Sequence, residues 1–289
     1  MEQVAVTLVI EPYCQETEEI LIAELSEIGY EGFVSADNGL TAYISSAEFR
    51  ESHLRLILDT YGITGFSKEY IPEKNWNADW DIRFNPVILK TGKGCSIRSA
   101  GNGAMIPVWP PVAYKLVIMP ELAFGTGHHP TTRMMLESLL EMEQQGFIKN
   151  RRVLDMGTGT GVLAILAAKM GAAVPVHALD NDRRSVHSCN ENARRNRIAH
   201  KVHVLHGDAS FIQSGRYGLI LANIHRNILI SEMDTLARGL EPGRGDLLLS
   251  GFFTTDVPAM MEAAQQHGLV LQKQKEKEGW SLLHLSKTS

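Results

Sequence analysis

The sequence predicts an α/β protein in which a mainly parallel sheet follows a small α+β domain. After residue 145, short apolar strands alternate with helix-length segments, which is typical of a parallel sheet covered by helices on both faces. Before residue 75, the predicted order is strand, helix, strand, strand, helix, strand. A chain of 289 residues with 44% hydrophobic and 21% charged residues is long enough for two domains, each with a buried core.

Residues 1–74 are predicted to form the small domain from two similar halves. The first half ends in a hairpin signal at residues 37–39, and each half contains one helix between strands. The apolar positions at helical spacing are Ile20, Leu21, Leu25 and Ile28 in the first helix and Phe49, Leu54, Leu58 and Tyr61 in the second. This βαββαβ order is that of a ferredoxin-like unit, whose sheet has one helix-covered face and one face free for a partner. We interpret it as a substrate-recognition domain.

Residues 75–113 are rich in Trp, Gly, Pro and Asn, and they are predicted to be a connector with irregular β structure. Trp76, Trp80 and Trp109 are either packing anchors at a domain junction or residues that line a cleft between domains.

Residues 114–289 contain the repeated strand and helix pattern. The expected strands are RRVLDMG, AVPVHALD, KVHVLHGD, YGLILANI and GDLLLSG, with helices between them that include one near 228–240 and one near 255–267. The last two strands, GLVLQKQKEKE and GWSLLHLSK, have no helix between them. They are therefore expected to form an antiparallel hairpin at one edge of the sheet.

A glycine-rich loop follows the first of these strands. It contains Asp155, Gly157, Gly159 and Gly161 immediately before a helix, so backbone N–H groups can approach a ligand closely. The spacing is G-x-G-x-G, not the G-x-G-x-x-G of dinucleotide-binding proteins, and the Gly-Lys-Ser/Thr of a phosphate loop is missing. An acidic residue two positions before the first glycine would repel a pyrophosphate and suits a ligand with a positive group.

Polar residues also follow the next three strands, at the sheet edge where ligands bind in such folds. Asp180 is placed to accept hydrogen bonds from both hydroxyls of a ribose. Asp208 is placed either to meet an adenine amino group or to cap a helix. Asn223 is expected beside the reacting end of the ligand, with a turn-forming role as the alternative.

The segment AFGTGHHPTT, residues 123–132, is predicted to be a loop that leads into a helix with Pro130 at its first position. His128 and His129 are adjacent and have no cysteine or carboxylate at ligand spacing, so no metal site is expected. Cys14, Cys95 and Cys189 are far apart and indicate neither a disulfide framework nor a zinc site.

The formal net charge of -5 disfavours nucleic acid as a direct substrate, and the basic segment 183–197 is interpreted as a solvated helix face. No apolar run approaches the roughly 20 residues of a membrane span, and the N-terminus lacks the pattern of a signal peptide. A cytoplasmic, monomeric protein without membrane contact is expected.

Together these motifs resemble the class I S-adenosylmethionine-dependent methyltransferases, and within them the family that methylates ribosomal protein eleven of the large subunit. The motifs that carry the resemblance are Asn75-Trp76, AFGTGHHPTT, the D-x-G-x-G-x-G loop, the ANI of residues 222–224, and KEKEGW at 275–280. The resemblance implies a Rossmann-like class I methyltransferase domain behind the ferredoxin-like domain. Thr158 and Thr160 depart from the commoner family loop, which has cysteine or serine between the glycines.

By this resemblance, S-adenosyl-L-methionine contacts are expected from Thr132, Gly157, Asp180 and Asn223, and more loosely from Phe124, Gly125 and Gly127. Asp155, Gly159 and Asp208 complete the expected site from the reasoning above. The implied activity is methylation of lysine ε-amines and the N-terminal α-amine of the ribosomal protein, free or on the ribosome. Asn223 is the expected catalytic residue, orienting the amine, and no general base is assigned.

Two other functions are compatible with parts of the sequence. A nucleic-acid N-methyltransferase would share the cofactor half of the sheet, but such enzymes follow this asparagine with Pro-Pro and an aromatic residue, whereas Ile224 and His225 stand here. A non-catalytic cofactor sensor would not need Asp155, the three glycines, Asp180 and Asn223 together.

Overall fold

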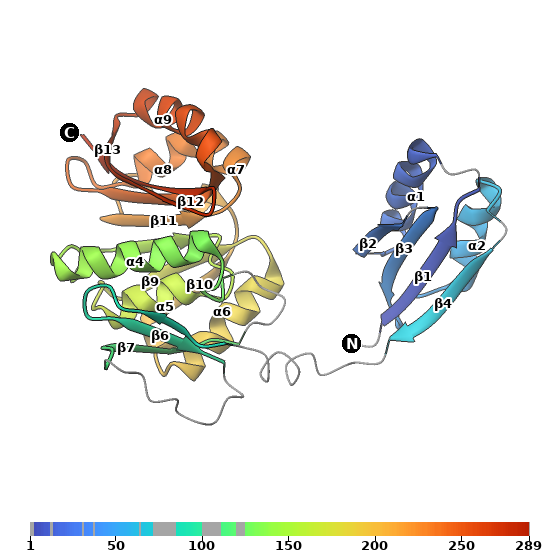
Figure 1. The fold of residues 1–289 in the computed structure, drawn as a ribbon, viewed down its shortest axis with the longest axis horizontal. Coiled ribbons are helices and arrows are strands. Elements are labelled where there is room, and N and C mark those ends of the chain that lie inside the picture. Colours follow the sequence, from blue (N-terminus) through green and yellow to red (C-terminus); the bar gives the residue numbers. More distant parts are fainter. Residues whose placement is uncertain are drawn as a thin grey trace. The chain divides into compact units, whose positions relative to one another are not determined.

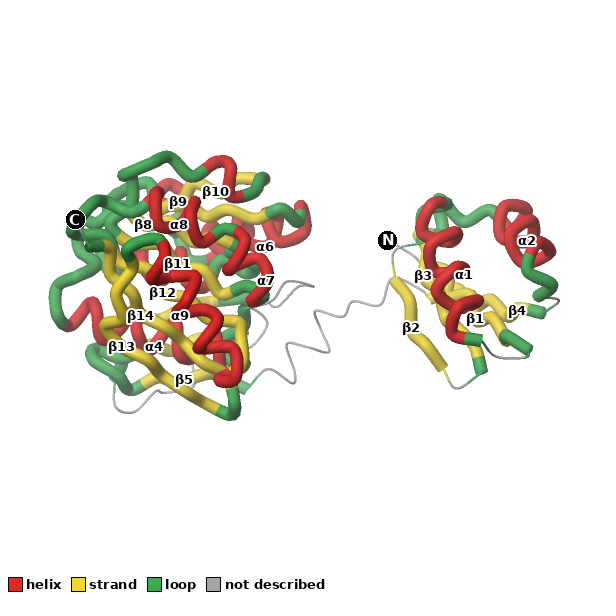
Figure 2. The backbone as a smooth tube through the Cα atoms, turned by 90° about the horizontal axis from the view of Figure 1, so that it is seen from above, coloured by secondary structure: helices red, strands yellow, loops and turns green. Residues whose placement is uncertain are grey.

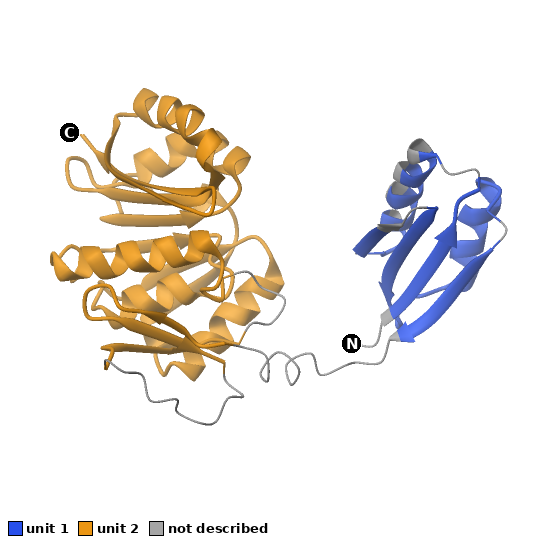
Figure 3. Cartoon of the chain, in the orientation of Figure 1, with its two compact units in different colours: residues 1–76 blue, residues 77–289 orange. Residues whose placement is uncertain are grey.

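The computed structural model describes residues 3–11, 14–30, 32–36, 38–63, 65–71, 85–99, 111–119 and 125–288. The chain divides into two compact units, residues 1–76 and residues 77–289 (Figure 3). Each unit has a hydrophobic core of its own.

The first unit has the ferredoxin-like arrangement. Its elements are β1 (Gln3–Val9), α1 (Gln15–Glu27), β2 (Gly32–Ala36), β3 (Gly39–Ser45), α2 (Glu51–Thr60) and β4 (Phe66–Ile71). The four strands form an antiparallel sheet in the order β2-β3-β1-β4, and both helices lie together on one face of it (Figures 1 and 2). Along β1 the alternate residues Val4, Val6 and Leu8 are buried in the core.

Helix α1 differs in one detail from the expected inward face. Leu21 and Leu25 are fully buried, but Ile20 is 38% exposed. Leu21, Leu25 and Ile28 lie on one face of the helix over about two turns. Ile20 lies beside that stripe, and its neighbour Leu21 takes the buried position.

The second unit is built on a seven-stranded sheet in the order β10-β9-β8-β11-β12-β14-β13. The first five strands in this order are parallel, and β14 and β13 are antiparallel (Figure 1). The strands are β8 (Val153–Met156), β9 (Val176–Asp180), β10 (Val202–His206), β11 (Leu219–Asn223), β12 (Asp246–Phe253), β13 (Leu269–Lys277) and β14 (Trp280–Lys287). The parallel sheet and the terminal hairpin were both predicted, and the Rossmann-like class is confirmed.

Helices cover both faces of this sheet. They are α4 (Pro130–Gln144), α5 (Val162–Lys169) and α6 (Arg183–Arg195) on one face, and α7 (Arg226–Ser231), α8 (Met233–Gly239) and α9 (Val257–Gln266) on the other. Neighbouring strand residues alternate between the two cores: Val153 packs with the first group and Leu154 with the second. Both faces are covered, which explains why the central strands read as continuous apolar runs.

The helix expected near 228–240 is two helices. α7 ends at Ser231 and α8 begins at Met233, with Glu232 between them at φ -97° and ψ 5°. Short 3-10 turns also occur at Ala199–Lys201, Ala209–Phe211 and Thr254–Asp256.

A small three-stranded sheet lies outside helices α4 and α5. Its strands are β5 (Val87–Leu89), β6 (Cys95–Arg98) and β7 (Tyr114–Val117) in the order β5-β6-β7, and their apolar side chains join the core of the second unit (Figure 1). Trp76, Trp80 and Trp109 of the expected connector lie outside the described residues. In the part of the chain that the structure describes, no helix is long and apolar enough to cross a membrane.

Candidate functional site

The predicted site residues follow one continuous row across the centre of the sheet. Met156 of β8 pairs with Leu179 of β9 on one side and with Ala222 of β11 on the other. Gly157, Asp180 and Asn223 are each the next residue after this row. The strand order reverses here, because β9 and β11 flank β8, and such a switch point is where open α/β sheets bind ligands.

The glycine-rich loop folds over the end of β9. The N–H groups of Gly157 and Thr158 both donate to the carbonyl of Leu179, at 2.8 and 3.1 Å. Gly157 has φ +70°, and a Cβ there would lie 2.2 Å from Cγ2 of Ile224. The position therefore needs glycine, because the loop must pass directly beside the segment that follows β11.

Asp155 lies beneath this loop with almost no exposure. Its Oδ2 accepts hydrogen bonds from Thr158 Oγ1 at 2.7 Å and from Ala164 N at 3.1 Å. Its Oδ1 is buried and has no hydrogen-bond partner among the described residues. Burial raises the pKa of Asp155 to about 7, so a nearby positive group would favour its charged form.

Asp180 ends β9 and is 9% exposed. One carboxylate oxygen accepts from Gly159 N at 2.9 Å and the other from Asp182 N at 3.0 Å. Each oxygen can accept a further hydrogen bond, so the pair remains suited to two adjacent hydroxyls. Asp180 thus joins the glycine loop to the end of the neighbouring strand.

Asp208 follows the adjacent strand, β10. It caps the 3-10 turn Ala209–Phe211 by accepting a hydrogen bond from Ser210 N at 2.9 Å. Capping, which was one of the two roles expected for Asp208, is therefore the role that it has in this structure. Gly207 donates to the carbonyl of Asp180 at 2.9 Å, which keeps Asp208 near the end of β9.

Asn223 contacts helix α4 across the edge of the sheet. Its Nδ2 donates to Oγ1 of Thr132 at 3.3 Å, and Thr132 is 1% exposed. The Oδ1 of Asn223 is buried and makes no hydrogen bond within the described part of the chain. An unsatisfied buried acceptor at a strand end is costly, and it indicates a position that a ligand donor completes.

The loop before α4 approaches the glycine-rich loop directly. Oγ1 of Thr160 donates to the carbonyl of Gly125 at 2.6 Å, and Gly125 has φ +111°. Gly127 lies two residues further on, and Pro130 occupies the first turn of α4, with His129 as the N-cap. Ala123 and Phe124 of the predicted segment lie outside the described residues.

The two histidines of this loop are in separate contacts. His128 is within 3.0 Å of Thr126 Oγ1 and 2.8 Å of the carbonyl of Asn85. His129 stacks edge-on against Trp280, with ring centroids 4.8 Å apart. Over the described ranges, no group of three or more His, Cys, Asp or Glu residues is arranged to hold a metal ion.

Sequence reasoning missed three polar residues that shape the site: Thr158, Thr160 and Asn192. The two threonines stood out only as departures from the family loop. The sequence does carry an indication that Asn192 is buried. Small polar residues recur at helical spacing in the segment interpreted as a solvated basic face, at Ser185, Ser188, Asn192 and Asn196. All four are buried.

The residues present fit S-adenosylmethionine. The close approach at Gly157 and the remaining acceptor capacity of Asp180 suit a ligand with ribose hydroxyls. The buried Oδ1 atoms of Asp155 and Asn223, which have no partner among the described residues, suit a positive amino-acid group and an N–H donor. Thr132 and Asn223 would lie at the reacting end, and the Gly125 loop would form a wall beside Thr160.

Known proteins resemble this chain over nearly its whole length. Residues 4–288 match the family described as ribosomal protein L11 methyltransferase (PrmA). A ribosomal protein L11 methyltransferase of Porphyromonas gingivalis is 39% identical over 276 residues, which cover 94% of this chain and 91% of the relative. One from Bacteroides fragilis is 36% identical over 275 residues, covering 93% and 94%.

A solved structure shows the same likeness. It is a ribosomal protein L11 methylase from Lactobacillus delbrueckii subsp. bulgaricus, with a TM-score of 0.60 and 26% sequence identity. The similarity covers 70% of this chain and 99% of the solved one.

Proposed function

The chain belongs to the ribosomal protein L11 methyltransferase family, and from that premise we propose which residues perform the reaction and which groups of L11 receive the methyl group. It is an S-adenosylmethionine-dependent enzyme that methylates ribosomal protein L11. The proposed acceptors are lysine ε-amines and the N-terminal α-amine. The proposed location is the cytoplasm, and the proposed working form is a single chain.

One observation supports the proposed residues more than any other. Gly157, Asp180 and Asn223 follow a single row of paired strand residues at the switch point of the sheet. Asp180 would accept the ribose hydroxyls, Asp155 would face the positive amino-acid end, and Thr132 with Asn223 would flank the methyl group. Asp208 would take the adenine amino group with the oxygen that does not cap its turn.

When bound, S-adenosylmethionine supplies a methyl group that is already activated by the positive sulfur. The protein must therefore align an amine with that methyl group and exclude water. The buried Oδ1 of Asn223 is suited to accept one N–H of the incoming amine, while its Nδ2 remains bonded to Thr132. This leaves the nitrogen lone pair available for the methyl carbon.

The amine must be neutral to react. A lysine amine has a pKa of about 10.4 in water, so it is mostly protonated at neutral pH. Burial at this site and a neighbouring positive charge both lower that pKa. The chemistry therefore requires no dedicated base, and none is assigned.

The ferredoxin-like unit is the proposed recognition domain for L11. On the face of its sheet opposite the helices, Thr7, Thr41 and Val34 lie in one row, with Val9 two residues beyond Thr7. Val9 and Val34 are 51% and 55% exposed. This row is uncharged and partly apolar, and Glu69, which pairs with Ala5 on the same face, is acidic. Such a face suits a folded protein partner better than a phosphate backbone.

The test uses methyl-labelled S-adenosylmethionine with hypomethylated L11 and, separately, with ribosomal RNA. Label in L11 is expected, on lysine side chains and the N-terminus after peptide mapping. Label in RNA would instead support a nucleic-acid methyltransferase. Cofactor binding without transfer to either substrate would support a sensor.

A further inference from the structure

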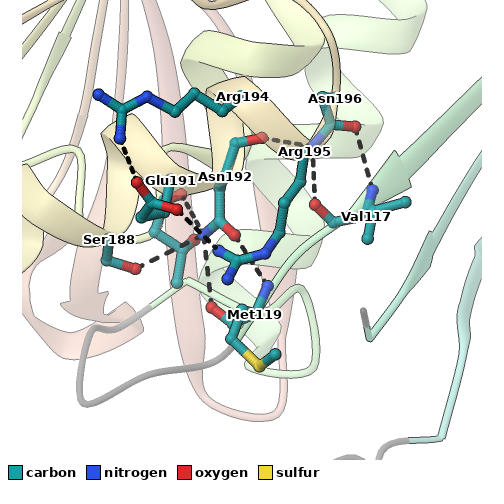
Figure 4. Close-up of polar contacts among 9 residues, drawn as sticks. Val117, Met119, Ser188, Glu191, Asn192, Arg194, Arg195 and Asn196 are labelled. Carbon is teal, nitrogen blue, oxygen red and sulfur yellow. Dashed lines mark hydrogen bonds and ion pairs between the residues drawn. The ribbon is translucent and has the colours of Figure 1, made fainter. Parts of the chain in front are cut away.

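Helix α6 carries two buried asparagines that bind an extended segment as a neighbouring strand would. Asn196 Oδ1 accepts from Val117 N at 3.1 Å, and its Nδ2 donates to Val117 O at 2.7 Å (Figure 4). Asn192 repeats this with Met119: Oδ1 accepts from Met119 N at 2.9 Å, and Nδ2 donates to Met119 O at 3.3 Å. A side-chain amide offers the same donor and acceptor as a peptide group.

The spacing explains why two asparagines four residues apart can do this. One helical step of four residues advances about 6.0 Å, and two residues of extended chain advance about 6.6 Å. Residues 117 and 119 also have the same orientation in an extended chain, because the period is two. Helix α6 therefore holds the end of β7 and the residues after it in a fixed register.

Asn192 also reaches the glycine-rich loop, which Asn196 does not. Its Nδ2 also donates to the carbonyl of Thr160 at 2.9 Å, inside the glycine-rich loop. On the other side of the same peptide group, Gly161 N donates to the carbonyl of Thr158 at 2.8 Å. The peptide between Thr160 and Gly161 is thus held at both its carbonyl and its N–H.

This peptide group needs such support because its N–H belongs to a glycine, Gly161. Gly161 has φ +80° and is the N-cap of α5, and glycine can also adopt other conformations at little cost. Without a donor to the Thr160 carbonyl, the peptide could rotate and the loop would populate other states. Cofactor affinity falls in proportion to the fraction of protein that has the binding-competent loop.

We propose that Asn192 is a positioning residue for the cofactor site, which holds the glycine-rich loop in its binding conformation and in register with Met119. Asn192 is fully buried, so its hydrogen bonds do not compete with water. The inference rests on the proposed function, because it concerns the loop assigned to S-adenosylmethionine.

The experiment compares Asn192→Asp with Asn196→Asp in the full chain. Both residues are buried, and each substitution places a carboxylate oxygen against two carbonyls that now receive an amide hydrogen. The difference is that only Asn192 reaches the loop. The affinity for S-adenosylhomocysteine is measured by calorimetry, thermal stability by scanning calorimetry, and loop order by hydrogen exchange of residues 157–163 in the ligand-free protein.

Asn192→Asp is expected to bind S-adenosylhomocysteine about tenfold more weakly and to exchange the loop amides faster, while Asn196→Asp stays within about twofold of the unmodified chain. The turnover number at saturating cofactor is expected to change little, so the loss appears in KM for the cofactor. Equal affinity of Asn192→Asp and the unmodified chain would overturn the proposal, and so would equal losses in both variants.

If the acidic variants fail to fold, Asn192→Ala and Asn196→Ala decide the question by the same measurements, because both lack the added charge. Failure of the unmodified chain to bind S-adenosylhomocysteine would overturn the proposed function itself. A different result, in which the unmodified chain and both asparagine variants all bind S-adenosylhomocysteine normally, would overturn only the role of Asn192.

Discussion

Asn223 is the residue at which the proposed cofactor site and the proposed alignment of the amine meet. It follows the central row of the sheet, bonds Thr132 through Nδ2, and keeps a buried Oδ1 without a partner in the described chain. A Cβ at Gly157 would lie 2.2 Å from Cγ2 of Ile224, so the glycine-rich loop passes directly beside the residue after Asn223. An amide at this point supplies an acceptor without adding a charge next to a positive cofactor.

Replacing Asn223 with alanine is expected to lower the turnover number by about 100-fold, because the amine loses the acceptor that orients it. Steady-state kinetics with L11, together with calorimetric binding of S-adenosylhomocysteine, measures this. Asn223→Asp keeps an acceptor oxygen and serves as the control that retains more activity. Turnover and cofactor affinity both at the unmodified level in Asn223→Ala would show that the amine is oriented by another group.

A partly buried polar cluster links β12, β14 and the residues just before β8, at the end of the sheet opposite the candidate site. Asp246 begins β12 and is bonded by Arg151 before β8 and by His284 on β14, the latter at 3.0 Å. Ser286 Oγ also donates to Asp246. Burial alone would raise the pKa of Asp246, but the hydrogen bonds from His284, Ser286 and Arg151 outweigh it and hold the pKa at about 2.

Asp246→Asn is expected to reduce the free energy of unfolding of the second unit by about 2 kcal/mol at pH 7. Because the folded-state pKa is lowered, this stabilisation is complete above pH of about 4 and is lost as the pH falls toward 2. Urea unfolding at several pH values measures the difference between the two proteins.

The matched control is Asp234→Asn, since Asp234 is 54% exposed and pairs with Arg238 on the same helix. It is expected to change stability by less than about 1 kcal/mol. If Asp246→Asn has the same free energy of unfolding as the unmodified chain at pH 7, the assigned role of the cluster is contradicted. The role is also contradicted if the loss of unfolding free energy is as large at pH 2 as at pH 7.

Elements with a clear period were predictable, and those set by tertiary contacts were not. The alternation of strands and helices predicted the parallel sheet, and the missing helix before residue 280 predicted the terminal hairpin. The break at Glu232 was not visible, because the apolar period continues through it. Ile20 fits a helical stripe but is displaced from the core by Leu21.

The same distinction holds for the candidate site. Glycines and acids after strands are visible in one sequence, because the strand end fixes where they lie. Asn192 contacts residues 32 and 73 positions away, so its partners depend on how α6 packs against β7 and the loop. A basic helix with a stripe of small polar residues would have been the only indication.

For the whole molecule, the two compact units are the main feature, and each has its own core. Every described residue assigned to the cofactor lies in the second unit. Cofactor binding and substrate recognition are therefore expected to be separable.

Deleting residues 1–74 is expected to leave the affinity for S-adenosylhomocysteine within about twofold and to abolish methylation of intact L11. Calorimetry and label transfer measure the two effects. In the full chain, Val34→Lys on the open face of the sheet is the matched variant, and a higher KM for L11 with unchanged cofactor affinity is expected. Full activity of the truncated chain on intact L11 would contradict the recognition role.

The most direct measurement is mass spectrometry of L11 from cells with and without the gene for this chain. L11 from cells that have the gene is predicted to carry methyl groups on lysine side chains and on its N-terminal amine, and L11 from cells without it is predicted to lack them. Identical methylation of L11 in both kinds of cell would contradict methylation of L11 by this chain.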